Sequence, residues 1–176
     1  NYIFFRGTSA YGNNIYIDDV TISNMYAVAA NACTWDYISN VTLSTINRSS
    51  ACDTYTLWAA PNPTLTQGST YTLSVTTDGD TEGIRAWIDY NGDGTFNNAV
   101  GTELVSGPSY AGTTPATYVV AVTIPGSATP GLTRLRVRCN YPTSPVDATS
   151  SQTYGETEDY NVTIAAATSC VGAPNA

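Results

Sequence analysis

Alternation with a period of two residues is the feature that most restricts how this chain can fold. In segment 133–140, Leu135, Val137 and Cys139 alternate with three arginines. Successive side chains of a strand point to opposite faces, so this pattern predicts a strand with one buried face. Helical periodicity is almost absent. Similar strand-like patterns occur in four further segments: 69–77, 83–89, 117–124 and 159–164.

Turn-forming residues separate these segments. They form the runs "PNP", "TQGS", "DGD", "SGPS" and "IPGSATPG", which begin at residues 61, 66, 78, 106 and 124. Short strands at such spacing predict an all-β fold, an antiparallel β-sandwich of the jelly-roll or Ig-like kind. We expect its core to contain Leu73, Val75, Ile84, Ile88, Val120, Val122, Leu135, Val137, Tyr160 and Val162.

The pattern divides the chain into four parts. Residues 33–165 form the sandwich, residues 24–32 and 166–176 are linkers, and residues 1–23 are an N-terminal β-hairpin appendage. Residues 1–22 carry apolar side chains on both strand faces. Unpaired strands of this kind recruit other strands, so the hairpin is either part of a preceding module or is donated to a neighbouring domain or an identical subunit. Head-to-tail donation between subunits would propagate into a filament.

The charge balance excludes several partners. The net charge is −8, and all six cationic residues are arginines. A basic patch for phosphates is therefore not expected, which argues against nucleic acid and anionic membranes as partners. The chain contains no run of about 20 apolar residues, so membrane insertion is not expected either. This composition is typical of a secreted protein, extracellular or at the cell surface.

The four cysteines also point to an oxidising compartment. Cys33, Cys52, Cys139 and Cys170 show no C-x-x-C spacing, and the chain has no histidine, so a zinc site is improbable. An even number predicts two disulfides. Of the three possible pairings we favour Cys33–Cys52 with Cys139–Cys170, which close the shortest loops; buried free thiols are the alternative.

The segment "WIDYNGDGTF" at 87–96 has the spacing of a calcium-binding loop. Oxygen-bearing side chains alternate with other residues at Asp89, Asn91 and Asp93, and Gly94 follows where an EF-hand loop has its glycine. Position 12 of such a loop would be Val100 instead of a glutamate. A plain Asn-Gly hairpin turn is the alternative. We expect calcium to be the cofactor, with the ligands Asp89, Asn91, Asp93, Thr95, Asn98 and Glu103.

A second acidic cluster lies at 154–164, "YGETEDYNVTI". Glu156 and Glu158 fall on one face of a strand and Asp159 on the other. Such carboxylates repel one another unless cations lie nearby. If segment 133–140 pairs with this strand, its arginines neutralise the acids across the strands; otherwise the three acids form a second cation site or an anionic-ligand platform.

Catalysis is poorly supported by the residues present. The absence of histidine excludes Ser-His and Cys-His triads. A glycosidase needs only two carboxylates, for which Glu103, Glu156 and Glu158 are available, but acids on such a sandwich are more often ligands. We therefore expect no enzyme. Aromatic side chains in turn-like segments either cap the ends of the sandwich or stack on glycans; the candidates for stacking are Trp58, Tyr110 and Tyr141.

Five segments together resemble a GEVED domain. They are residues 33–47, 65–75, 85–96, 124–141 and 154–164, in the order expected of that family, and the Gly-Glu-x-Glu-Asp motif is represented by Gly155, Glu156, Glu158 and Asp159. The resemblance implies a secreted multidomain protein of the Bacteroidetes type and a module not known as a catalyst. Residues 1–22 resemble the last strands of a jelly-roll-like module. In the loop, Asn97 and Asn98 replace an expected acid, and Glu103 is displaced by extra residues.

These observations predict a non-catalytic, calcium-stabilised extracellular module with a structural or adhesive function, self-assembling into filaments by strand addition. The alternative is a carbohydrate-binding accessory domain of a secreted enzyme. Binding to glycans by the isolated domain would favour the second prediction, and fibres or concentration-dependent oligomers would favour the first.

Overall fold

A computed structural model describes most of the chain. The described residues are 26–28, 33–78, 82–99, 101–105, 109–110, 116–145 and 147–168, without the side chains of 109, 110 and 116. The predicted hairpin at 1–23 lies outside these residues, as do Cys170 and most of the predicted linkers. In the described part of the chain, no helix has the length and apolar character needed to cross a membrane.

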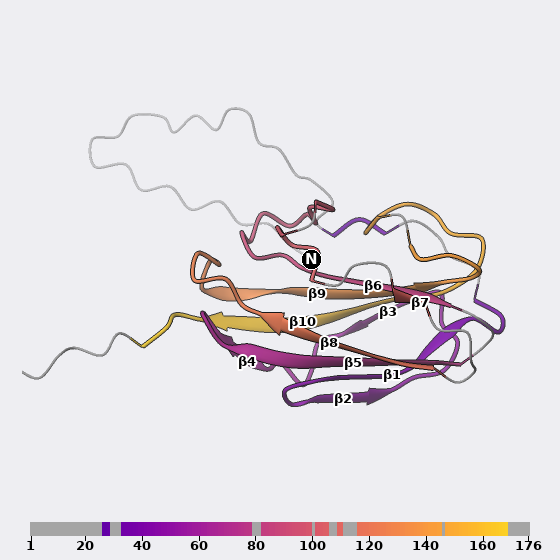
Figure 1. Ribbon diagram of the computed structural model, residues 1–176, viewed down its shortest axis with the longest axis horizontal. Coiled ribbons are helices and arrows are strands. Elements are labelled where there is room, and N and C mark those ends of the chain that lie inside the picture. The colour runs from indigo at the N-terminus through magenta and orange to yellow at the C-terminus, as the bar shows by residue number, and fades with distance from the viewer. Residues whose placement is uncertain are drawn as a thin grey trace, which may run out of the picture.

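The described residues contain ten strands in two sheets (Figure 1). They are β1 (Tyr37–Leu43), β2 (Ile46–Ser49), β3 (Tyr55–Trp58), β4 (Thr64–Thr66), β5 (Thr70–Asp78), β6 (Gly83–Ile88), β7 (Ser109–Tyr110), β8 (Ala116–Thr123), β9 (Gly131–Asn140) and β10 (Thr157–Ala165). One sheet has the order β2-β1-β5-β8, and the other has the order β3-β10-β9-β6-β7, with β4 also paired to β10. The fold is an all-β sandwich, as the alternation predicts.

The sandwich is not purely antiparallel. Strand β10 pairs antiparallel with β9, but parallel with β3 and with β4 along its other edge. Parallel pairing arises because the chain passes through β3 and β4 in the direction of β10, although about a hundred residues separate them. Sequence alternation reports which face of a strand is buried and carries no information about the direction of its neighbour.

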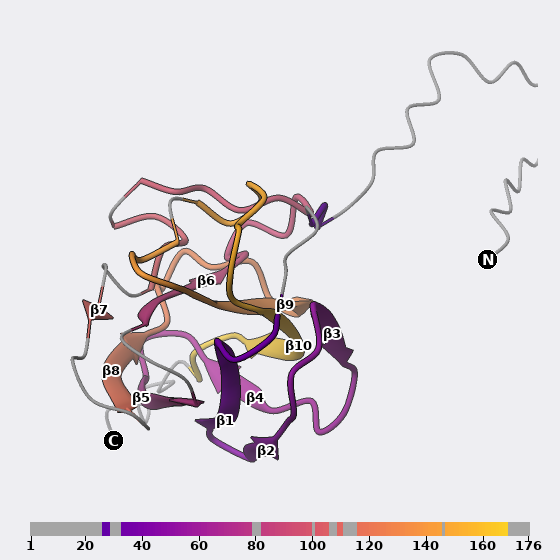
Figure 2. The same cartoon turned by 90° about the vertical axis from the view of Figure 1, so that its right-hand side faces the viewer.

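The core lies between the two sheets, as Figure 2 shows end on. Nine of the ten predicted core residues are buried and belong to one apolar cluster, and Val120 packs against that cluster while partly exposed. Inner-facing residues of β9 and β10 alternate with polar residues on the outer face, which agrees with the predicted pattern.

Loops cover the outer face of the sheet that contains β9. The segments 89–99, 101–105, 141–145 and 147–156 lie on this side (Figure 1). Trp87, which points outward from β6, is completely buried there with Phe96 and Ala148, and Tyr26 and Leu104 pack against them. The molecule therefore has a second, smaller core outside the sandwich, and residues 26–28 are packed against it.

Candidate functional site

Gly155 begins the acidic motif just before β10. Its φ is +111°, a conformation that favours glycine, and a Cβ at this position would lie 2.2 Å from the carbonyl oxygen of Cys139. The Cys139 amide donates a hydrogen bond of 3.1 Å to the carbonyl oxygen of Glu156. The glycine therefore lets the chain approach β9 closely, which places the following acids against both sheets.

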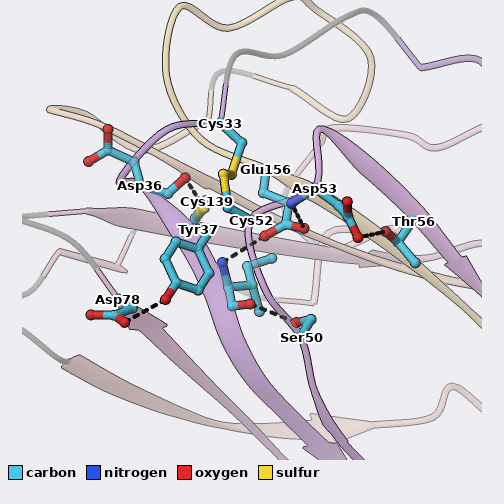
Figure 3. Close-up of a disulfide and its surroundings, with 11 residues drawn as sticks. Cys33, Asp36, Tyr37, Ser50, Cys52, Asp53, Thr56, Asp78, Cys139 and Glu156 are labelled. Carbon is cyan, nitrogen blue, oxygen red and sulfur yellow. Dashed lines mark hydrogen bonds between the residues drawn. A yellow bond between two sulfur atoms is a disulfide. The ribbon is translucent and has the colours of Figure 1, made fainter.

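Glu156 connects three segments of the chain. Its Oε2 accepts a hydrogen bond of 2.9 Å from the amide of Ile38 in β1, and its Oε1 accepts one of 3.3 Å from the amide of Asp53, just before β3. Figure 3 shows the carboxyl group beside the Cys33–Cys52 disulfide. Burial raises the pKa of Glu156 to about 8, and the negative charge of Glu158 adds to this.

Glu158 is also buried, and its oxygens accept from side chains. Oε1 accepts from the indole nitrogen of Trp58 at 3.2 Å, and Oε2 accepts from the hydroxyl of Tyr160 at 2.6 Å. Burial raises the pKa of Glu158. Both glutamates therefore lie on the inner side of β10 with their oxygens engaged inside the protein.

Asp159 points to the opposite face, where the arginines of β9 neutralise it. Arg136 binds it through two nitrogens at 2.7 and 2.8 Å, and Arg134 binds it at 3.2 Å. The hydroxyl of Tyr55 donates to the same carboxylate at 3.1 Å. The predicted neutralisation is therefore present for Asp159, and the three acids do not converge on one point.

The buried arginines hold the covering loops. Arg136 is fully buried and donates to the carbonyl oxygens of Tyr26, Ala27 and Ala148 at 2.8 to 2.9 Å. Arg138 donates to the Asp147 carbonyl at 2.6 Å and the Ser150 carbonyl at 2.7 Å. The arginine ladder thus connects the sheet to the second core.

One of the two expected disulfides is formed. Cys33 and Cys52 are bonded, with their Cα atoms 5.7 Å apart. The prediction that Cys139 is bonded to Cys170 is wrong, because Cys139 is a free thiol. It is completely buried on the inner face of β9. Its Sγ lies 3.8 Å from the carbonyl oxygen of Asp36 within the core (Figure 3). Alternation places this side chain in the core with Leu135 and Val137.

Glu82, which the sequence pattern did not mark, is a further buried acid near this thiol. It is 0% exposed, and the polar groups beside its carboxyl group are the Cys139 thiol and the backbone of Tyr37. Burial raises its pKa to about 8, and the negative charges of Asp36 and Asp78 contribute. No sequence signal marks it, because glutamate is rarely buried completely.

The predicted calcium loop is closed by its own hydrogen bonds. Asp89 is buried and accepts from the amides of Gly92 and Gly94 at 2.6 and 3.0 Å, and from the hydroxyl of Tyr26 at 2.7 Å. The side chains of Asn91 and Asp93 contact each other, and Asp93 also accepts two hydrogen bonds from Thr95, which lower its pKa.

Glu103 and Asn98, the two remaining predicted calcium ligands, bind different parts of the chain. Glu103 accepts from the amide of Asn97 at 2.7 Å, and its pKa is raised by burial, with contributions from Asp89 and Asp93. Asn98 instead accepts from the amide of Ala148 at 3.1 Å in the second core. Oxygen donors of this kind suit a hard cation, but among the described residues no three acidic, cysteine or histidine side chains are grouped as a metal site.

The aromatic candidates for glycan stacking have different surroundings. The guanidinium group of Arg48 lies over the ring of Trp58, 4.4 Å from its centroid, so that face is already covered. The side chain of Tyr110 lies outside the described part of the chain. Tyr141 makes an edge contact with Tyr154, with ring centroids 6.2 Å apart. Both tyrosines line a cavity in the segment that connects β9 to β10.

The fold and the buried acids define an all-β sandwich module whose acidic motif is built into its core. Residues 83–163 match the model of the GEVED domain family. The match confirms the resemblance over β6 to β10. The expected Bacteroidetes context and the preceding jelly-roll module remain predictions.

Three solved structures illustrate how distant the structural similarities are. A family 123 glycoside hydrolase from Clostridium perfringens is 12% identical, with a TM-score of 0.39 over 63% of this chain and 23% of the hydrolase. The PKD domain of an M14-like peptidase from a Thermoplasmatales archaeon is 17% identical, with a TM-score of 0.35 over 76% of this chain and 98% of the domain. A CARDB domain from Pyrococcus furiosus is 9% identical, with a TM-score of 0.37 over 73% of this chain and 97% of that domain.

At such TM-scores none of these structures carries an argument about this chain, which spans less than a quarter of the hydrolase. No curated protein matches the chain. The GEVED match and the sandwich fold indicate a non-catalytic accessory module. The disulfide fits an extracellular domain, because disulfides persist in oxidising compartments.

Proposed function

We propose that this chain is a structural module of a secreted or cell-surface protein, and that its acidic motif stabilises the fold instead of performing catalysis. The observation that carries the proposal is the engagement of all three carboxylates. Glu156 binds two backbone amides, Glu158 binds Trp58 and Tyr160, and Asp159 binds two arginines. A general acid or nucleophile must reach its substrate, whereas these side chains are 0% exposed.

An assay on the purified chain tests the proposal against the glycosidase alternative. We expect no hydrolysis of aryl glycosides above the rate of an Asp159→Asn variant, and we expect that variant to unfold more easily than the natural chain. Hydrolysis that disappears in Glu156→Gln or Glu158→Gln, while the fold remains intact, would contradict a purely structural motif.

The proposal includes calcium binding at the loop of residues 89–103. The support is uncompensated negative charge: Asp89 and Asp93 lie close enough to raise the pKa of Glu103, and none of the ion pairs among the described residues involves these three acids. A divalent cation held by such oxygens would offset this repulsion and rigidify the loop.

Thermal unfolding with a chelator and then with excess calcium tests this site. A ligand that binds only the folded state adds about 2.7 kcal/mol at a hundredfold excess over its dissociation constant. Asp93→Ala should abolish the response, while Asp78→Ala, an exposed acid outside the loop, should retain it. An unchanged midpoint in the natural chain would exclude calcium as its stabiliser.

Self-assembly by strand addition also belongs to the proposed function. It concerns residues 1–22, which lie outside the described residues, and is supported by their two-faced apolar sequence. Light scattering of the full chain and of a variant lacking residues 1–22 tests it. If only the full chain forms larger particles, donation between subunits is supported. If the full chain and the variant are both monomeric over a wide concentration range, donation is refuted.

A further inference from the structure

The connection between β9 and β10 lines a solvent-open cavity that the structural role does not use. Its volume is about 350 Å³, at the lower end of the range of about 300–1,000 Å³ for small-molecule sites. Two tyrosines line it together with uncharged polar residues, chiefly Asn140, Thr143, Ser150 and Gln152. A lining without charged side chains favours a neutral ligand.

The walls of this cavity are held in place before any ligand arrives. Arg138, anchored in β9, donates to the carbonyl oxygens of Asp147 and Ser150. The carboxylate of Asp147 accepts from the amides of Thr149 and Ser150 at 2.7 and 2.6 Å. The side-chain amide of Gln152 donates to the Cys139 carbonyl at 3.0 Å. A preformed site loses less conformational entropy on binding.

The lining offers both an aromatic surface and unfilled hydrogen-bonding capacity. Tyr154 is 44% exposed and meets Tyr141 edge to face. The Oε1 atom of Gln152 is buried and has no hydrogen-bond partner, although the Nε2 atom of the same side chain is bound. Because solvent does not reach this atom, a ligand in the cavity would pair instead with exposed polar groups of the lining, such as the hydroxyl groups of Thr143 and Thr153.

We propose that this cavity binds a neutral saccharide. The C–H face of a pyranose ring would pack on the exposed ring of Tyr154, and its hydroxyl groups would pair with the amide and hydroxyl groups of the lining. A ligand with a hydroxyl on nearly every carbon matches this density of polar groups better than a peptide side chain does. The site goes beyond the structural role proposed above, and it does not include Trp58.

Titration of the full ¹⁵N-labelled chain with neutral hexasaccharides of glucose, xylose, mannose and N-acetylglucosamine, followed by NMR, tests the proposal. We expect at least one to shift the amide signals of Tyr141, Gln152 and Tyr154. Tyr154→Ala should weaken binding about tenfold, because an aromatic contact contributes on the order of 1 kcal/mol. Tyr154→Phe should bind nearly as well as the natural chain.

Trp35→Ala is the matched control, because Trp35 is 77% exposed and does not line the cavity; its affinity should equal that of the natural chain. The same spectra report whether each variant is folded. Absence of binding to the whole panel, equal binding by Tyr154→Ala, or binding of oligoproline without any saccharide would each overturn the proposal. The structural role is measured by unfolding and does not depend on these outcomes.

Discussion

The carboxyl group of Glu82 is completely buried, so this residue links stability to pH. Burial raises its folded-state pKa from the usual 4.5 to about 8. Above the unfolded pKa, the unfolded chain releases this proton while the folded chain keeps it. The stabilisation is therefore complete below about pH 4.5 and is lost as the pH rises toward 8. Glu156 behaves in the same direction.

The free energy of unfolding should therefore fall between pH 5 and pH 8, by an amount on the order of 3 kcal/mol or more, since one pKa unit is worth about 1.4 kcal/mol. Glu82→Gln should have a shallower dependence, with the slope that remains arising from Glu156. Urea unfolding at several pH values checks this. Equal slopes for the natural chain and the variant would show that Glu82 ionises freely in the folded state.

Gly155 is a second single residue on which the stability of the fold depends. Gly155→Ala should destabilise the fold by about 3 kcal/mol or more, because the new Cβ meets the Cys139 carbonyl at 2.2 Å and the backbone has a positive φ. Gly68→Ala, with φ of +77° and open space, should cost only about 1 kcal/mol. Gly126→Ala meets nothing within 4 Å and should be neutral. A melting temperature for Gly155→Ala equal to that of Gly126→Ala would contradict the close approach.

At the scale of elements, the paired strands β9 and β10 carry the organisation of the outer face. Asp159 lies opposite Arg136 in their register, and Thr157 lies opposite Arg138. Arg136, Arg138 and Asp159 on this face are nevertheless buried, because the loops cover them. A buried ion pair is a weak source of net stability, but removing one partner leaves the other charge without compensation.

Asp159→Asn should therefore lower the free energy of unfolding by about 3 kcal/mol, since it leaves Arg136 buried with a neutral partner. Asp78→Asn is the control, because Asp78 is exposed and accepts one hydrogen bond from Tyr37; it should change stability by less than about 1 kcal/mol. Denaturant unfolding of both variants provides the comparison. Similar small losses would mean that the arginines find other acceptors.

Sequence alternation was sufficient for five of the ten described strands but not for the others. β5, β6, β8, β9 and β10 each follow the predicted segments closely. Strands β3 and β4 are short and contain threonine at exposed or half-buried positions, so they show no clear apolar face. The arginines of β9 look solvent-facing by alternation, and their burial depends on loops distant in sequence. The favoured pairing put Cys139 in a disulfide on the basis of cysteine spacing, although alternation already places this side chain on the inner face, where it is a buried free thiol.

At the scale of the whole molecule, the acidic motif connects the two sheets. Glu156 directly precedes β10 of one sheet and accepts a hydrogen bond from the amide of Ile38 in β1 of the other. The disulfide between Cys33 and Cys52 closes the same end of the sandwich. Loss of this contact should weaken the association of the sheets and not merely one strand.

Urea unfolding of Glu156→Gln, followed by the fluorescence of the buried Trp87, is the most direct test of a structural motif. Glutamine keeps the shape of the side chain but replaces one acceptor by a donor that faces a backbone amide. We expect the free energy of unfolding to fall by about 2 kcal/mol, in a single cooperative transition. A midpoint equal to that of the natural chain would contradict a structural role for the motif and leave its carboxylates available for another function.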